Sequence, residues 1–439
     1  MKVKLTISLV ILVFVIALMP LSAQAKSRAT VKRQSIRDEN PKMGKEWLAL
    51  PYVFSTDDLG TVFGVGGGAK GYFQDQLILG GTVFGGPDDT YGGVLGAWDF
   101  QLPQTERFFL TAVGSYGHYQ KQRAYTALSY EPGVPRRGSN DSDEDDFVVT
   151  PGNNNWADFR LEYVVPIGAA RKQAMMTYHL SGGMLKGDGT GGDTWNPLKA
   201  GVTTLMVRQF NQLQSFETEF GIFERPIHPM EFGIGYDNTD YPNNPSVGSS
   251  QFLSVTRDFG WGDALFPWTF WEVEASKYLS LGESGLAKQR VIALNAWTGD
   301  SPSWNESVNA QGNIVITDRP PQYEGASLGG FYRMRAFPSN RFNDRSVIYT
   351  TAEYRYTPRW NPIGEVSWLR WLKMDWWQVV GFVEGGRVAK ADSMSELFSD
   401  WKVDAGVGIR AMMAGGVVRL DWAISDEGSS MWVMFGHPF

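Results

Sequence analysis

Cysteine is absent from the 439 residues, and histidine occurs only four times. The lack of cysteine excludes disulfides, thiolate chemistry and a lipid anchor carried on a cysteine thiol. The four histidines, at positions 118, 179, 228 and 437, do not show metal-ligand spacing. We therefore expect no His-based transition-metal site, and no other pattern indicates a cofactor.

An excess of basic residues is also missing. The chain has 40 Lys and Arg against 47 Asp and Glu, which gives a formal net charge of −7. This balance argues against nucleic acid as a partner, because clustered cations are what bind a phosphate backbone. The acidic run 139–146 is most simply interpreted as the solvated tip of a long external loop.

Long apolar runs are limited to the start of the chain. Lys2 and Lys4 precede the apolar stretch Leu5–Met19, Pro20 ends it, and Ala23-Gln24-Ala25 supplies a small-x-small pattern. This order predicts a cleaved secretory signal peptide over residues 1–25. The alternative is an anchor helix, but the run is shorter than the ~20 apolar residues that a spanning helix needs. No later segment resembles a membrane helix, so a membrane-embedded chain would have to form a closed β-barrel.

Glycine and aromatic residues are abundant, with 50 Gly, 17 Trp, 17 Tyr and 26 Phe. Aromatics suit the interfacial girdles of a barrel, and glycine suits its turns and close packing. Residues 26–46 form a short basic arm, too short for a folded domain, which we expect to be a flexible periplasmic lead-in. From Trp47 to Phe439 short runs of alternating polarity continue without a change of pattern, so 47–439 is predicted to be one barrel domain.

Alternation is clearest in the last third of the chain. In 402–410, Val403, Val407 and Ile409 fall on one face, and Asp404 and Arg410 fall on the other. Segments 271–279, 347–356 and 418–424 alternate in the same way. A soluble sheet turns such charges to bulk water, whereas a membrane barrel turns them into a wet lumen and its apolar face to lipid. The signal peptide and the end of the chain favour the barrel.

The same alternation gives sixteen candidate strands, an even number as expected for a bacterial single-chain barrel. They lie near 49–55, 60–73, 76–87, 91–102, 107–121, 156–166, 174–186, 229–238, 250–260, 267–281, 287–298, 345–357, 376–389, 402–413, 415–424 and 430–439. Segment 201–220 leaves room for a further hairpin. The longest connections are expected at 122–155, 187–228 and 299–344, with long loops at one end of the barrel and short turns at the other.

The chain end resembles the C-terminal signal by which the barrel assembly machinery recognises outer-membrane barrels. Terminal Phe439 follows Phe435, Val433 and Met431 at alternating positions, although His437 stands where another aromatic is usual.

Segments of about the last 210 residues resemble the BamA/TamA superfamily, the bacterial surface antigen type of barrel. Met334-Arg335-Ala336-Phe337 is similar to the loop-six motif Val-Arg-Gly-Phe/Tyr of that family. Phe382-Val383-Glu384-Gly385-Gly386 resembles its Phe-x-Asp-x-Gly strand, and 406–410 resembles its Gly-x-Gly-x-Arg strand. Segment 236–248 is similar to its Tyr-Asp-x-Arg-Asp pattern but lacks the Arg.

The resemblance implies an all-β, transmembrane antiparallel barrel of sixteen strands in a Gram-negative outer membrane, with a long loop folded into the lumen. It also implies that Arg335 of the loop faces Glu384. Parity agrees, because Glu384 shares a face with Phe382, and a guanidinium inside a lumen needs a fixed carboxylate. Gly386 and Arg410 are expected to line the same lumen. Ala336 replaces a Gly of the family, and Ala is penalised there if the position needs a positive φ.

In function, the resemblance implies outer-membrane biogenesis or transport of protein or lipid, without enzymatic activity. The expected partners are outer-membrane lipids, the barrel assembly machinery and a periplasmic protein, because arm 26–46 leaves no room for the periplasmic POTRA domains of larger members. The alternatives are a lipid hydrolase and a passive pore or adhesin. Gly325-Ala326-Ser327-Leu328-Gly329 matches a nucleophile elbow, but no helical pattern follows and the sole later histidine is His437. We therefore predict no catalytic residue.

Overall fold

The computed structural model describes residues 28–38, 45–56, 60–192, 194–218, 221–361, 371–390 and 393–439. The segment predicted as a signal peptide, 1–25, lies outside the described residues, as do 26–27 and 39–44 of the arm. Within the described ranges, no helix is long and apolar enough to cross a membrane.

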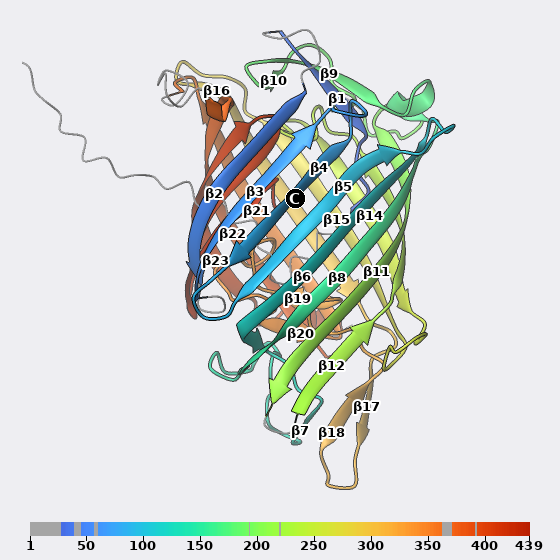
Figure 1. The fold of residues 1–439 in the computed structure, drawn as a ribbon, viewed down its shortest axis with the longest axis vertical. Coiled ribbons are helices and arrows are strands. Elements are labelled where there is room, and N and C mark those ends of the chain that lie inside the picture. Colours follow the sequence, from blue (N-terminus) through green and yellow to red (C-terminus); the bar gives the residue numbers. More distant parts are fainter. Residues whose placement is uncertain are drawn as a thin grey trace, which may run out of the picture.

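One antiparallel sheet closes into a barrel and accounts for most of the described chain (Figure 1). Consecutive strands pair in chain order around the wall. The wall elements are β2 (Glu46–Thr56), β3 (Gly60–Lys70), β4 (Ile78–Gly85), β5 (Tyr91–Gln101), β6 (Phe108–Ala124), β8 (Val148–Val164), β11 (Val202–Thr218), β12 (Gly221–Ile227), β13 (Met230–Asp237), β14 (Gly248–Asp258), β15 (Trp268–Ser280), β16 (Ala287–Asp300), β21 (Ser346–Pro358), β22 (Met374–Ala389), β23 (Lys402–Met413), β24 (Gly416–Ser425) and β25 (Gly428–Phe435).

The predicted number of wall strands is confirmed. β12 and β13 follow one another along the same neighbour, β11, and act as one interrupted strand, so the seventeen wall elements of the described ranges make 17 − 1 = 16 strands. Because pairing runs from β2 round to β25 and the sheet is closed, the seam of the barrel lies between these two strands.

The two faces of the wall differ as the alternation predicted. In β23, Val403, Val407 and Ile409 are 52%, 55% and 51% exposed, whereas Asp404 and Arg410 are 2% and 0% exposed. Strands β8, β11, β15, β21, β22 and β24 repeat this arrangement, with apolar side chains exposed on the outside and charged side chains buried inside. An apolar exterior around an ionic interior is the pattern of a transmembrane barrel.

The connections fall at two ends of the barrel. The terminal end, where β2 begins and β25 ends, has the short connections 71–77, 102–107 and 281–286, and also the long connection 165–201 with its short helix η1 (Gly168–Arg171). The loop end has connections 125–147 and 301–345, and the one-turn helix α1 (Met394–Leu397) after β22. The expectation that long connections lie at one end only was therefore wrong.

Two strand assignments were also wrong, and their errors cancel in the count. Segment 174–186 is not part of the wall: β9 (Met176–Ser181) and β10 (Met184–Leu185) form a small sheet at the terminal end with β1 (Arg33–Arg37). Segment 201–220, placed within a long connection, instead supplies wall strand β11. Figure 1 shows β1, β9 and β10 at the upper end of the barrel, where they form a sheet separate from the wall.

Residues 28–38 are held against the barrel rather than forming the flexible arm that was expected. β1 pairs in parallel with β9, with Arg33 opposite Met176 and Arg37 opposite Leu180. The backbone N–H of Met176 donates to Lys32 (2.7 Å), and that of Asp38 donates to Leu180 (2.9 Å), which extends the pairing at both ends.

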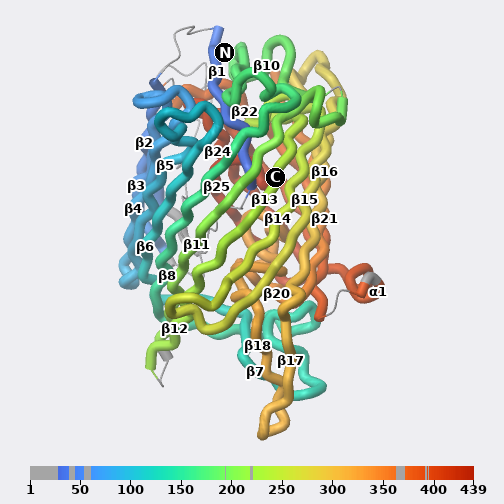
Figure 2. Tube along the Cα trace, turned by 90° about the vertical axis from the view of Figure 1, so that its right-hand side faces the viewer, coloured from blue at the N-terminus to red at the C-terminus, as the bar shows by residue number. Residues whose placement is uncertain are grey.

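The connection 301–345, here called loop six, folds back into the lumen as predicted. Its first part is the hairpin of β17 (Asn305–Val308) and β18 (Ile314–Thr317), which joins β7 (Ser129–Tyr130) beyond the loop end (Figure 2). Its second part forms β19 (Ala326–Leu328) and β20 (Phe342–Asp344). Apolar side chains of this part, including Leu328, Met334 and Phe337, share one buried cluster with inward residues of the wall.

Candidate functional site: the anchored tip of loop six

The tip of loop six, 329–337, is a compact turn. Gly329 and Gly330 both have φ of 107°, and Met334 has φ of 57°. Backbone bonds close the turn, from Gly329 N–H to Arg333 (3.1 Å) and from Gly330 N–H to Phe337 (3.0 Å). The left-handed position within the motif is thus Met334 and not Ala336, so the penalty considered for Ala at 336 does not arise.

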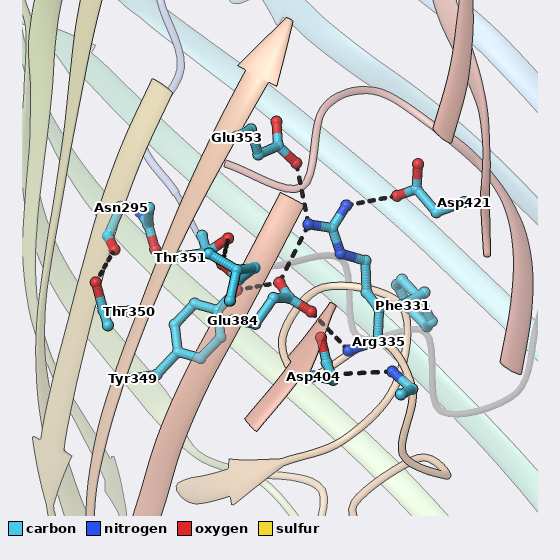
Figure 3. A network of polar contacts seen from close by, with 12 residues as sticks. Asn295, Phe331, Arg335, Tyr349, Thr350, Thr351, Glu353, Glu384, Asp404 and Asp421 are labelled. Carbon is cyan, nitrogen blue, oxygen red and sulfur yellow. Dashed lines mark hydrogen bonds and ion pairs between the residues drawn. The ribbon is translucent and has the colours of Figure 1, made fainter. Parts of the chain in front are cut away.

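Arg335 extends from this turn into a set of carboxylates on the wall (Figure 3). Its Nη1 lies 2.7 Å from Asp421, and its Nη2 lies 3.0 Å from Glu353 and 3.2 Å from Glu384. The predicted Arg335–Glu384 contact is therefore present, as one of three. Burial alone would lower the pKa of Arg335, but Glu384, Asp421 and Glu353 together raise it above its ordinary value.

The backbone of the tip is held by the wall as firmly as the guanidinium. The N–H of Arg335 donates to Glu384 (2.7 Å) and that of Ala336 donates to Asp404 (3.0 Å). In the other direction, Trp432 Nε1 donates to the carbonyl of Arg335 (2.7 Å). Together, strands β22, β23 and β25 therefore fix the main chain of two consecutive loop residues, Arg335 and Ala336.

The network contains equal numbers of basic and acidic side chains. Four guanidinium groups and four carboxyl groups take part, and each residue is at most 2% exposed: Arg335, Arg355, Arg410, Arg419, Glu353, Glu384, Asp404 and Asp421. Glu353 also accepts from Arg410 (2.7 Å) and Arg355 (2.9 Å), and Asp421 also pairs with Arg419. Groups buried this deeply are tolerated only when paired and hydrogen-bonded, which requires the loop and the wall to fit together.

The remaining residues predicted for the motif lie in the same place. The guanidinium of Arg335 stacks on the ring of Phe382, 3.4 Å from the ring centroid. Phe337 packs on Phe342 of the loop, with ring centroids 5.1 Å apart. At Gly386 a Cβ would lie 2.7 Å from the carbonyl oxygen of Ile348, so the absence of a side chain allows close packing of β22 on β21.

The alternation of segments 347–356, 402–410 and 418–424 assigned Glu353, Arg355, Asp404 and Asp421 to the charged faces of their strands, but it did not connect them to the loop. Their parity was the available signal. Which inward charge meets which depends on the stagger of neighbouring strands, and parity does not contain that information.

Loop six also contacts strands β15 and β16, which precede β21 in the wall, and the other loops. The guanidinium of Arg333 lies 3.5 Å from the ring centroid of Trp297, and its Nη2 is 3.5 Å from Glu274. Arg341 donates to Glu427 (2.7 Å) in the β24–β25 turn and to Ser142 (2.8 Å) in connection 125–147. The loop is therefore fixed to the arc of wall from β15 to β25 and to connection 125–147.

The last residues of the chain leave the wall after β25. Met431, Val433 and Phe435 share the outer face of that strand, and they are 60%, 7% and 39% exposed, respectively. β25 ends at Phe435, and after Gly436 (φ 78°) the chain turns inward. Phe439 is 6% exposed inside the barrel, stacked on Tyr278 at 6.4 Å, so the expected strand to residue 439 ends four residues earlier.

The candidate nucleophile Ser327 lies beside a cavity. A cavity of about 130 Å³ between loop six and the wall is lined by Ser327, Arg208, Glu231 and Glu324. The Ser327 hydroxyl donates to Asn340 (3.0 Å), and the short strand β19 carrying it is followed by the turn of the tip rather than by a helix. Across the described ranges, no three His, Asp or Glu side chains are placed to hold a metal ion.

No protein-family model matches the sequence, and neither does any curated protein. Among solved structures, the fold is similar to BamA from Haemophilus ducreyi lacking POTRA domains 1–3, with a TM-score of 0.47 and 12% identity over 89% of this chain and 68% of that one. It is similar to CdiB from Acinetobacter baumannii with the same score and identity, and the match covers 89% of this chain and 58% of the CdiB chain. At this identity the likeness concerns the fold alone.

Proposed function

We propose that this protein is an outer-membrane barrel of the assembly and translocation type, exported by a cleaved signal peptide, whose lumen is closed by loop six. Its work is to insert or move polypeptide or lipid, and it is not an enzyme. The observation that carries the proposal is the anchoring of Arg335 and Ala336 on strands β21 to β25. These strands lead up to the seam, so a movement of the seam strands would act on the loop directly.

A passive pore is the weaker alternative. A diffusion pore needs an open aqueous lumen, whereas here loop six folds into the lumen and is paired with β22 and β15. A lipid hydrolase has even less support, because the Ser327 hydroxyl is hydrogen-bonded to the side-chain amide of Asn340 and not to a histidine.

The proposed partners are inferred from the outer face of the barrel, from β25 and from the terminal end. Membrane lipids would contact the apolar exterior, and the barrel assembly machinery would read the outward residues of β25 during insertion. A periplasmic partner protein would meet the terminal end, where the sheet of β1, β9 and β10 is presented. We propose no role for nucleic acid.

The test uses purified full-length protein in phospholipid vesicles. We expect low resting conductance, together with faster insertion of an unfolded outer-membrane barrel polypeptide, or faster transbilayer movement of a fluorescent phospholipid, than in empty vesicles. Vesicles with a passive porin are the control. The proposal is overturned if the protein accelerates neither insertion nor lipid movement. Fatty-acid release that is lost in Ser327→Ala would establish the hydrolase instead.

A further inference from the structure

Residues 28–32 of the arm lie inside the lumen on an acidic part of the wall. Lys32, which is fully buried, places its Nζ 2.6 Å from both Asp99 of β5 and Glu162 of β8. Arg28 pairs with Glu274 of β15, its Nε lying 3.1 Å from the carboxylate. We call Asp99, Glu162 and Glu274 the acidic track.

The track binds the main chain of the arm as well as its charges. The N–H of Thr30 donates to Glu162 (2.7 Å), and Arg160 donates to the carbonyl of Arg28 (3.1 Å). Farther along, β1 continues as a strand added to β9. Main-chain bonding together with charge pairing is the recognition mode for an extended peptide, whereas a lipid headgroup offers no backbone to match it.

The wall is shaped to admit this segment. Gly235 of β13 faces Ala29, and a Cβ at 235 would lie 2.8 Å from the Cβ of Ala29. Beside the arm a cavity of about 190 Å³ is lined by Ala29, Val31, Phe252 and Ser276. The track thus has space for larger side chains than the small ones that the arm places there.

We propose that the acidic track is a binding site for extended, basic polypeptide segments, and that the arm is its built-in occupant. The inference rests on the proposed function and gives it a substrate class: a client polypeptide with cations spaced like Arg28 and Lys32 displaces the arm. Acidic segments are excluded by like charge.

The experiment takes advantage of the cysteine-free chain. Thr30→Cys in the full-length protein reports the arm through its rate of labelling by a membrane-impermeant thiol reagent. Gly235→Ala is expected to raise that rate at least tenfold, because the added Cβ and Ala29 cannot occupy the same space. Gly235→Ala combined with Ala29→Gly restores the space and should return slow labelling. Lys32→Glu is a second, independent way to release the arm.

The probe is a fluorescent peptide with the sequence of residues 28–38, added to the Gly235→Ala or Lys32→Glu protein. We expect binding that weakens about tenfold or more when the peptide has Gln in place of its two track-binding cations, or when Glu162→Gln and Glu274→Gln are introduced.

The proposal is overturned if neither Gly235→Ala nor Lys32→Glu changes labelling, since the arm is then a fixed part of the wall. It is equally overturned if the peptide does not bind an arm-released variant, or binds regardless of Glu162 and Glu274. Peptide binding without insertion or lipid movement in vesicles would support the track and remove the proposed function alone.

Discussion

Removal of the Arg335 guanidinium is the sharpest test of how loop six is held. In Arg335→Ala, Glu353 keeps Arg355 and Arg410, and Asp421 keeps Arg419. Glu384 keeps its hydrogen bond from the hydroxyl of Tyr349 but loses its ion pair with Arg335. The described residues show no other ion pair of Glu384. One buried carboxylate is therefore left without a counter-charge.

Leaving a single buried charge unpaired costs about 3–5 kcal/mol. We use the lower end, about 3 kcal/mol, because two of the three carboxylates keep partners. Since 1.4 kcal/mol is a factor of ten, the equilibrium between docked and released loop should shift by about a hundredfold. Arg335→Ala combined with Glu384→Gln removes the stranded charge and should recover part of that loss.

Two measurements follow the loop: the temperature at which the compact band disappears on semi-native gels, and single-channel conductance. Arg335→Ala should lower the first and raise the second. Arg359→Ala is the matched control, because its pair with Glu283 is exposed, and such pairs contribute little. Wild-type behaviour of Arg335→Ala, or a double variant no better than the single one, would refute the reasoning.

Three further outcomes are expected. Gly329→Ala should loosen the tip and raise conductance, because φ at Gly329 is 107° and an added Cβ would lie 2.1 Å from the carbonyl oxygen of Pro338. Gly381→Ala is the control and should have no effect, because a Cβ at 381 would meet open space. Equal conductance of the two variants would contradict the strain argument. Val407→Arg on the outer wall should lower the free energy of unfolding in vesicles by about 2–4 kcal/mol. Val308→Arg, on the hairpin beyond the loop end, should leave it unchanged. If Val407→Arg also leaves it unchanged, that face of the wall lies in water. Burial raises the pKa of Glu324, in loop six, to about 8, so the folded state holds its proton more tightly than the unfolded chain, and this contribution to stability is lost as pH rises from about 4.5 through 8. In Glu324→Gln the semi-native gel midpoint should fall less between pH 5 and pH 8 than in wild type, and identical pH profiles would exclude the effect.

Alternation predicted the barrel because each strand carries the signal locally. Val407 outside and Asp404 inside can be read from one strand without knowing its neighbours. The strand over 201–220 was harder to recognise, since its second half has Gln and Asn on both faces where it continues past β13 to pair with β12. Segment 174–186 shows the reverse difficulty, because period-two alternation is the same in a strand of the wall and in a strand of a small separate sheet.

The candidate site was predictable as far as the loop motif and one partner. Arg335 and Glu384 were identified by resemblance and parity, but Asp421 joins them through strand stagger that the sequence does not reveal. The contacts of the arm were missed for a related reason, since Arg28 and Glu274 are 246 positions apart. At the chain end a local signal was present and overlooked: Pro438 cannot donate to a ladder, which argues against a strand continuing to Phe439.

Glu274 connects the two segments that occupy the lumen. Its carboxylate accepts a hydrogen bond from Arg28 of the arm, and the guanidinium of Arg333 in loop six lies 3.5 Å from the same carboxylate. When one cation leaves a shared carboxylate, the other must neutralise it alone, so release of the arm should tighten Arg333, and release of the loop should tighten Arg28. Effects of Gly235→Ala and Arg333→Gln on the labelling rate of Thr30→Cys should then be non-additive, by about 0.5–3 kcal/mol when expressed as free energies. Strict additivity would mean that the arm and the loop open independently, and that a client displacing one leaves the other closed.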